Sequence, residues 1–178
     1  MRRTIWITLA AVVALVAAGA ATGIIIHDTQ PLEARFEAQA IGDPHITPCP
    51  ALGRAGVKIE TDYRGTFTTA EEELVFTLRL ERLLDRDREL GAAEGTWTLT
   101  GSDGRLQGSG ELVAFGEVNE LHGMLIGVAP PPEGDGPPGR LLANFSASLG
   151  DGGRTLTGAI GDPSTYPNPG VLIPPGNC

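Results

Sequence analysis

The residues of this chain that could transfer protons are His122 and the carboxylates near it. Glu120 precedes His122 by two residues, and Glu111 lies on the neighbouring predicted strand. A histidine within reach of a carboxylate is a common pair for general acid and base catalysis. The simpler interpretation is that strand alternation turns His122 toward solvent. We therefore expect a protein that is not an enzyme.

The other polar residues show no catalytic or metal-binding pattern. His27 and His45 lie too far from His122 in the sequence to suggest a shared metal, and no calcium-loop motif is present. Ser146 and Ser148 lack the Gly-x-Ser-x-Gly turn that exposes a nucleophilic serine. We therefore expect neither a metal nor another cofactor.

Cys49 and Cys178 are the only cysteines of the chain, and their spacing is not that of a metal site. In an oxidising compartment such a pair predicts a disulfide. The bridge would tie the segment before the predicted domain to the last residue of the sequence. In the chain-entropy model a loop of this size stabilises the fold by on the order of 4–5 kcal/mol. Two free thiols are the alternative.

The first 26 residues indicate where the rest of the chain lies. Arg2 and Arg3 precede Thr4 to Ile26, a run without an ionisable side chain. As a helix, this run of about 23 residues is roughly 34 Å long, which is enough to cross a bilayer core. The two arginines favour a cytoplasmic N-terminus. We therefore expect a single-pass cell-membrane protein with residues 27–178 outside the cytoplasm.

A cleaved signal peptide is the alternative for the same residues. Ala18-Gly19-Ala20 is a small-x-small site that follows an apolar stretch. Cleavage after Ala20 would give a secreted protein. The apolar run continues past that site to Ile26, which favours an uncleaved anchor.

The exported part is acidic. The whole chain has a formal net charge of −9, and leaving out Arg2 and Arg3 leaves 11 basic against 22 acidic residues. Because binding to nucleic acid requires a basic surface, we expect no nucleic-acid partner. The expected partners are the membrane, through the N-terminal helix, and either a small apolar ligand or an envelope protein.

The composition divides the chain into four segments. These are a signal anchor or transmembrane helix over 1–26, a turn-rich stalk over 27–56 with a short helix at 32–40, a folded domain over 57–161, and a proline-rich tail over 162–178. Prolines exclude the tail from helices and central strands. A second proline cluster at 130–138 predicts one long exposed loop within the domain.

Apolar residues alternate with polar ones along most of the domain, which predicts strands. The pattern is clearest over 74–81, 95–100 and 141–149, and it is weaker over 57–69, 106–115, 120–128 and 154–160. Residues 70–90 could instead form a helix, since Thr69 and Glu72 resemble a capping box. The alternation favours a strand there.

Sequential strands with short connections predict a mainly β fold, an antiparallel meander. Closure into a barrel hides the sheet edges most completely, and a two-sheet sandwich is the alternative. If the inward side chains pack fully, the barrel is filled. If they leave space, the result is an apolar cavity lined by Phe76, Trp97, His122 and Phe145.

Gly95-Thr96-Trp97 resembles the Gly-x-Trp motif of lipocalins, although it stands in mid-chain, where that family does not place it. The stretch 91–128, with Gly108-Ser109-Gly110, is similar to allene-oxide-cyclase and dirigent-like barrels. The resemblance implies an antiparallel barrel that holds an apolar small molecule. No catalytic residue of these families can be placed on this sequence. The chain also resembles exported β-barrel proteins of GC-rich bacteria.

These observations predict a membrane-tethered extracytoplasmic β-barrel, a non-enzymatic module for binding or envelope interaction. The alternative is a barrel that binds or isomerises a small hydrophobic molecule in a cavity near Trp97. A third hypothesis is an envelope-assembly component whose loop at 130–138 contacts a partner.

Overall fold

The computed structural model of the chain describes residues 34–131, 137–161 and 178. The predicted anchor over 1–26 and most of the proline-rich tail lie outside these residues. Among the described residues, no helix has the length and apolar character needed to cross a membrane. The described elements are β1 (Ala34–Ala40), β2 (His45–Pro48), η1 (Pro50–Leu52), β3 (Gly56–Thr68), β4 (Glu73–Asp85), β5 (Leu90–Thr100), β6 (Leu106–Glu117), β7 (Glu120–Ala129), β8 (Gly139–Gly150), η2 (Asp151–Gly153) and β9 (Thr155–Gly161).

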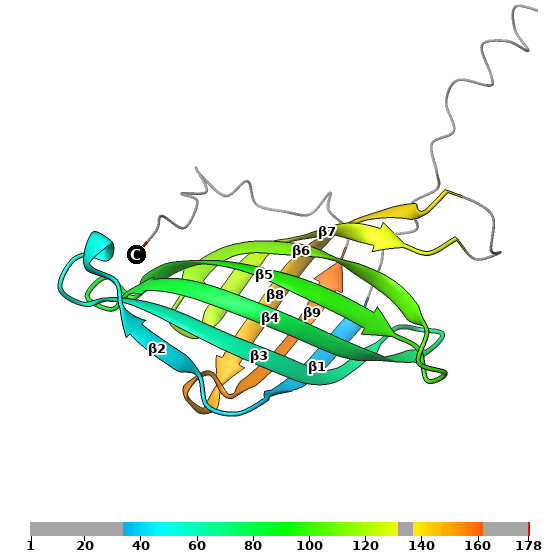
Figure 1. Cartoon of the computed structure of the whole chain (residues 1–178), viewed down its shortest axis with the longest axis horizontal. Coiled ribbons are helices and arrows are strands. Elements are labelled where there is room, and N and C mark those ends of the chain that lie inside the picture. The colour runs from blue at the N-terminus through cyan, green and yellow to red at the C-terminus, as the bar shows by residue number, and fades with distance from the viewer. Residues whose placement is uncertain (1–33, 132–136, 162–177) are drawn as a thin grey trace, which may run out of the picture. The chain divides into compact units, whose positions relative to one another are not determined.

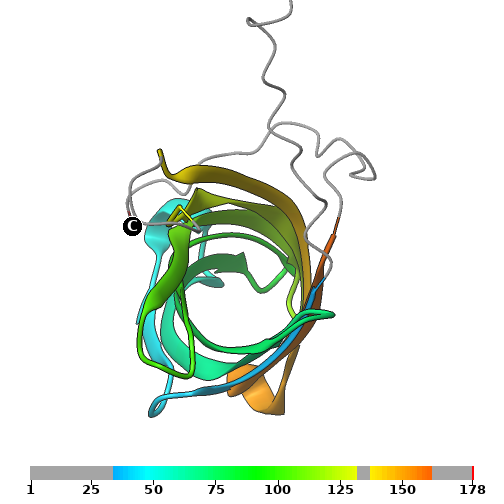
Figure 2. The same ribbon diagram turned by 90° about the vertical axis from the view of Figure 1, so that its right-hand side faces the viewer.

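Eight of the strands close into an antiparallel barrel, which Figure 1 shows from the side and Figure 2 shows along its axis. The order around the wall is β1-β9-β8-β7-β6-β5-β4-β3, and β3 then pairs with β1. At this seam Ala38 of β1 lies opposite Gly65 of β3. β2 follows β1 along the same edge of β3. The predicted antiparallel barrel is confirmed, and the sandwich alternative is wrong.

The segment over 70–90, for which a helix was the alternative, contains the whole of β4. Its side chains alternate between the interior and the exterior up to Glu81. β4 pairs along its whole length with β3 and over most of its length with β5. Strand pairing on both edges outweighs the helix propensity of its leucines and charged residues.

The chain enters the barrel earlier than the sequence predicts. Two parts of the predicted stalk over 27–56, residues 34–40 and 45–48, are strands of the sheet. Residues 34–40 form β1, so the helix predicted over 32–40 is wrong. Side chains that favour helices dominate this segment, yet Ala34, Phe36 and Ala38 are buried and the residues between them face outward. Pairing with β3 on one edge and β9 on the other decides the conformation.

The two ends of the barrel differ. At the end that we call the disulfide end, β3 begins beside the end of β4, and Cys49 lies next to the start of β3. At the end that we call the proline end, β1 begins beside the end of β9, and β7 ends where the proline-rich segment follows it. The short links β4–β5, β6–β7 and β8–β9 lie at the disulfide end.

Apolar side chains from all eight barrel strands form one continuous core. Phe36 stacks on Phe145 with ring centroids 5.3 Å apart, and Phe76 packs against Phe36 at the same separation. An eight-stranded barrel has an interior just wide enough for its own side chains to fill. These rings occupy that space across the barrel.

Candidate functional site

The residues predicted to line a cavity fall into two groups. Phe76, Trp97 and Phe145 face the interior, are at most 2% exposed, and belong to the packed core. His122 faces outward from β7 with 50% of its side chain exposed, so its placement in a cavity is wrong. Successive side chains of a strand point to opposite faces, and the buried neighbours of His122 take the inward positions.

Trp97 is the largest side chain of the core. Its indole Nε1 donates a hydrogen bond to the carbonyl of Glu111 at 3.1 Å. A Cβ added at Gly127 would lie 2.5 Å from the ring, and one added at Gly108 would lie 3.3 Å from it. The glycines of β6 and β7 therefore make room for the indole. In this barrel the Gly-x-Trp segment serves the packing of the interior.

His122 and Glu120, the predicted acid–base pair, lie side by side on the outer face. His122 Nε2 is 3.8 Å from Glu120 Oε2, and the two side chains are 50% and 61% exposed. Glu111 is opposite Ile126 rather than His122. Solvent screens the interaction of an exposed pair of this kind. Catalytic histidines are typically buried in a cleft beside a charged partner, and this exposed pair on the outer wall does not have that arrangement.

The predicted disulfide between Cys49 and Cys178 is confirmed, with the two Cα atoms 4.8 Å apart. Cys49 is fully buried, and its backbone N–H donates to the carbonyl of Gly56 at the start of β3. The last residue of the chain is therefore attached to the disulfide end, next to the seam-forming strand β3.

A polar group inside the disulfide end has no counterpart in the sequence predictions. Tyr63 and Arg82 face inward and are 1% and 7% exposed. The Tyr63 hydroxyl donates to the carbonyl of Gly153 at 2.5 Å, and Arg82 Nη1 donates to the carbonyl of Val118 at 3.1 Å. The two bonds thus attach the β8–β9 link, at Gly153, and the β6–β7 link, at Val118, to the barrel wall. The alternation through Leu80 places Arg82 inside, which is the signal that could have found it.

Burial controls the protonation of this group. Loss of hydration lowers the pKa of Arg82, and the nearby Tyr63 partly offsets that effect. Burial also raises the pKa of Tyr63, against smaller opposite effects of Arg82 and of the nearby Thr61 side chain. Among the described residues, Arg82 Nε and Thr61 Oγ1 have no hydrogen-bond partner.

The substitution Tyr63→Phe is expected to change how stability depends on pH. It removes the bond to Gly153 and should cost about 1–2 kcal/mol at neutral pH. Because the pKa of Tyr63 is raised by folding, the unfolded chain loses this proton first as the pH rises through about 10. Wild-type stability should then fall more steeply than that of Tyr63→Phe, so that the two converge. Urea unfolding at neutral and alkaline pH measures this, and parallel curves would contradict it.

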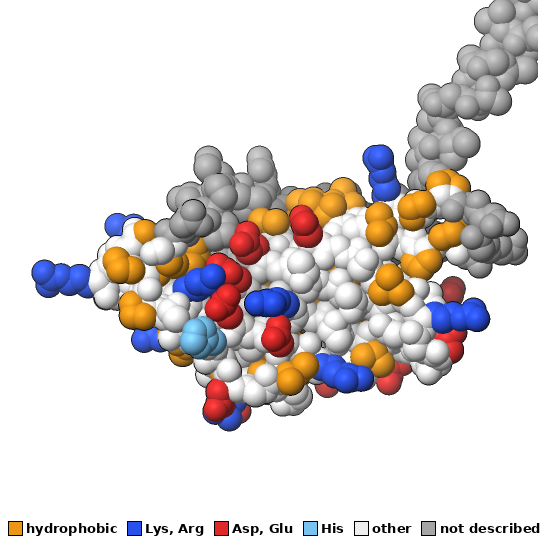
Figure 3. Space-filling model, in the orientation of Figure 1, with side chains coloured by type: hydrophobic (Ala, Val, Ile, Leu, Met, Phe, Trp, Pro, Cys, Tyr) orange, Lys and Arg blue, Asp and Glu red, His pale blue; other side chains and the backbone are white. Residues whose placement is uncertain are grey.

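An apolar strip covers the outer wall near the proline end. Ile126 and Leu142 are directly opposite each other on β7 and β8, and Val128 follows Ile126 on the same face of β7. These side chains are 52%, 46% and 45% exposed, respectively. Figure 3 shows hydrophobic side chains gathered over this end of β7 and β8. We call Ile126, Val128 and Leu142 the apolar strip.

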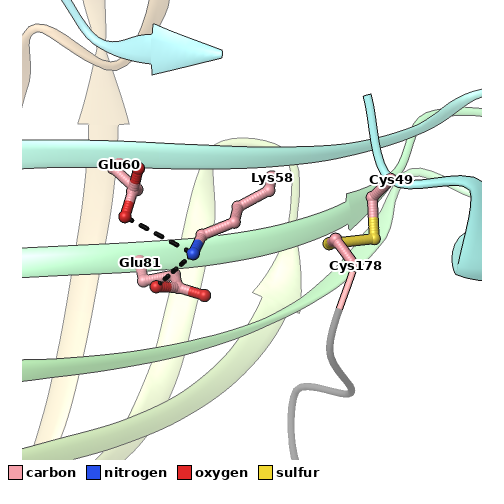
Figure 4. A network of polar contacts seen from close by, with 5 residues as sticks. All are labelled: Cys49, Lys58, Glu60, Glu81 and Cys178. Carbon is pink, nitrogen blue, oxygen red and sulfur yellow. Dashed lines mark ion pairs between the residues drawn. A yellow bond between two sulfur atoms is a disulfide. The ribbon is translucent and has the colours of Figure 1, made fainter. Parts of the chain in front are cut away.

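Charged side chains cover another part of the outer wall. Lys58 Nζ lies 2.8 Å from Glu81 and 3.4 Å from Glu60. Figure 4 shows the two ion pairs. The contact with Glu81 is the main cause that raises the pKa of Lys58. A hollow of about 350 Å³ lies beside them, over β4, β5 and β6. We call this surface the charged wall. It consists of Lys58, Glu60, Asp62, Arg79, Glu81, Glu94 and Glu111.

A larger hollow, of about 870 Å³, lies at the proline end where β1, β3 and β9 meet. Its lining mixes the inward-facing Phe36 with outward-facing polar residues such as Arg35 and Glu37. It borders Ala34 and Gly161, beyond which the chain lies outside the described residues. This lining of apolar and polar side chains carries charges of both signs, so it does not favour a ligand of one particular charge.

Within the described ranges, no three His, Cys, Asp or Glu side chains are grouped so that they could hold a metal ion. Comparisons of the chain with models of protein families, with curated proteins and with solved structures found no match. The resemblance to lipocalins and to allene-oxide-cyclase or dirigent-like barrels therefore stays a prediction, beyond the antiparallel barrel itself.

Proposed function

We propose that this protein is a membrane-tethered extracytoplasmic barrel that binds another envelope protein through its outer wall and performs no catalysis. The single observation that carries the proposal is the filled interior, in which Phe36, Phe76, Trp97 and Phe145 occupy the lumen. A barrel packed in this way offers its outer surface for recognition. The filled lumen weighs against the alternative of a hydrophobic ligand or an isomerase reaction.

The charged wall is the surface best suited to a protein partner. It carries five carboxylates and two cations, and one of these cations, Lys58, is already held by Glu60 and Glu81. Its hollow is lined by three of the carboxylates, Glu81, Glu94 and Glu111, and by the other cation, Arg79. The excess of negative charge fits a partner segment rich in lysine or arginine. Complementary charges of this kind steer association and select partners more than they add affinity.

Location can be tested with the full chain in a bacterial host. The proposed tether predicts that the protein stays in the membrane fraction after alkaline extraction, and that protease added to spheroplasts digests the barrel. An N-terminus beginning at Ala21, found by protein sequencing, would mean release and would contradict the tether.

Binding can be tested by photo-crosslinking from Asp62, on the charged wall, with Thr157 on β9 as a matched control, since both are exposed outward-facing strand positions. We expect a defined protein to be captured from position 62 and not from position 157. The purified partner should bind the double variant Glu94→Gln, Glu111→Gln roughly three- to tenfold more weakly. Equal capture at both positions, or unchanged affinity, would refute binding through this wall.

A further inference from the structure

The apolar strip borders the charged wall at Glu111, whereas the β3 part of that wall lies on the opposite side of the barrel, and this arrangement suggests an orientation. We infer that the apolar strip rests on the lipid surface of the membrane to which the chain is tethered. The inference deepens the proposed function and rests on its tether. It gives a role to Ile126, Val128 and Leu142, three exposed side chains that take no part in the core of the barrel.

The length of the chain keeps the proline end close to the membrane. The apolar run ends at Ile26 and β1 begins at Ala34, so only residues 27–33 connect them. Fully extended, this connection reaches at most about 29 Å. Ala34 lies at the proline end, and so do Val128 and Leu142 near the end of β7 and the start of β8. A tether this short gives the strip a high effective concentration at the bilayer, so a weak contact suffices.

The surroundings of the strip suit a lipid headgroup region. Arg140 is opposite Val128 in the strand register and is exposed, and the side chain of Arg105 at the same end is 84% exposed. Arginine binds phosphate through its planar fork of donors, while aliphatic side chains enter the boundary with the acyl chains. Exposed Pro130 continues the apolar surface beyond β7. Glu111, opposite Ile126, marks the border of the strip toward the charged wall.

The opposite side of the barrel is unsuited to the bilayer. β3 lies four strands from β7 in either direction around the wall, so the outer face of β3 points directly away from the strip. That face carries Lys58, Glu60 and Asp62, and the β3–β4 link at the proline end carries exposed Glu71 and Glu72. Anionic headgroups repel carboxylates. With the strip on the membrane, the β3 side of the charged wall faces away from it, toward a partner.

The test uses the full chain reconstituted in vesicles of phosphatidylethanolamine and phosphatidylglycerol. A spin label is placed at Val128→Cys or, as a matched control, at Asp62→Cys on the opposite side, while Cys49 and Cys178 stay paired with each other. We expect the ratio of collisions with oxygen to collisions with a water-soluble nickel chelate to be severalfold higher at position 128 than at 62. Vesicle flotation reports in the same samples whether the chain is tethered.

The outcomes separate the tether from the orientation. Protein that floats with the vesicles while both labels meet the nickel chelate equally would overturn the lipid contact and leave the tether intact. Protein that does not float would overturn both. A label at 128 that is shielded from both collision partners, or that couples magnetically to a second label, would assign the strip to a protein partner or a second copy and would overturn the lipid contact.

A second variant tests whether the apolar strip itself holds the label at the lipid surface. Ile126→Thr with Leu142→Thr changes only outward-facing positions and keeps residues that suit a strand. With the label still at 128, we expect the collision ratio to fall toward that of position 62. An unchanged ratio would show that the strip does not hold the label at the lipid surface.

Discussion

The substitution Gly65→Ala is expected to open the barrel at its seam and to lower the free energy of unfolding by at least about 3 kcal/mol. A Cβ at this position would lie against the Glu37 carbonyl oxygen and 2.5 Å from Ala38 Cα, both of which are backbone atoms of β1. β1 cannot move aside, because its other edge is paired with β9. The closing pair β1–β3 would have to separate, and both strands would then present free edges.

Gly161→Ala is the matched control, since no atom of the described residues lies within 4 Å of a Cβ added at Gly161 and its φ is not in the left-handed region. Chemical denaturation should show a stability close to that of the wild type for Gly161→Ala and a large loss for Gly65→Ala. Size-exclusion chromatography should also detect association of Gly65→Ala through the exposed edges. Equal stability of the two variants would show that the seam tolerates a side chain and that our account of closure is incorrect.

Trp97→Ala is expected to cost about 3–5 kcal/mol, because it removes the largest core side chain and leaves a cavity. The substitution also leaves the carbonyl of Glu111 without the indole donor. Gly108 and Gly127, which accommodate the ring, have no side chains that could fill the space. We therefore expect the variant, unlike the wild type, to bind an apolar probe such as indole within its lumen.

The measurement for this prediction combines urea unfolding with titration of indole. Trp97→Phe, which keeps a ring in the lumen, should lose less stability and bind the probe more weakly than Trp97→Ala. Tight binding of indole by the wild type would contradict the filled interior, and with it the observation on which the proposed function rests.

Much of the wall could be predicted from local patterns. The alternation around Phe76, Trp97 and Phe145 predicted strands and correctly placed these three side chains inside. The same alternation is consistent with the outward direction of His122, which contradicts its predicted place in the cavity. The disulfide followed from there being only two cysteines in a chain that is predicted to be exported.

The sequence predictions failed where the conformation depends on residues that are far away in the chain. β1 has the composition of a helix, and only its position between β3 and β9 makes it a strand. Arg82 interrupts an apolar series on β4, yet it is stabilised inside because a loop carbonyl 36 residues away accepts its hydrogen bond. Neither partner can be recognised from the residues that flank these positions.

For this protein, then, the sequence by itself determined the strand pattern, the cysteine pair and the acidic character of residues 27–178. These are properties of neighbouring residues or of composition. The tertiary structure alone decided that β1 closes the barrel against Gly65, that the lumen is full, and that the apolar strip lies on the side opposite the outer face of β3. The physical reason is that alternation specifies which face a side chain takes, whereas closure depends on the pairing of strands that are far apart in the chain.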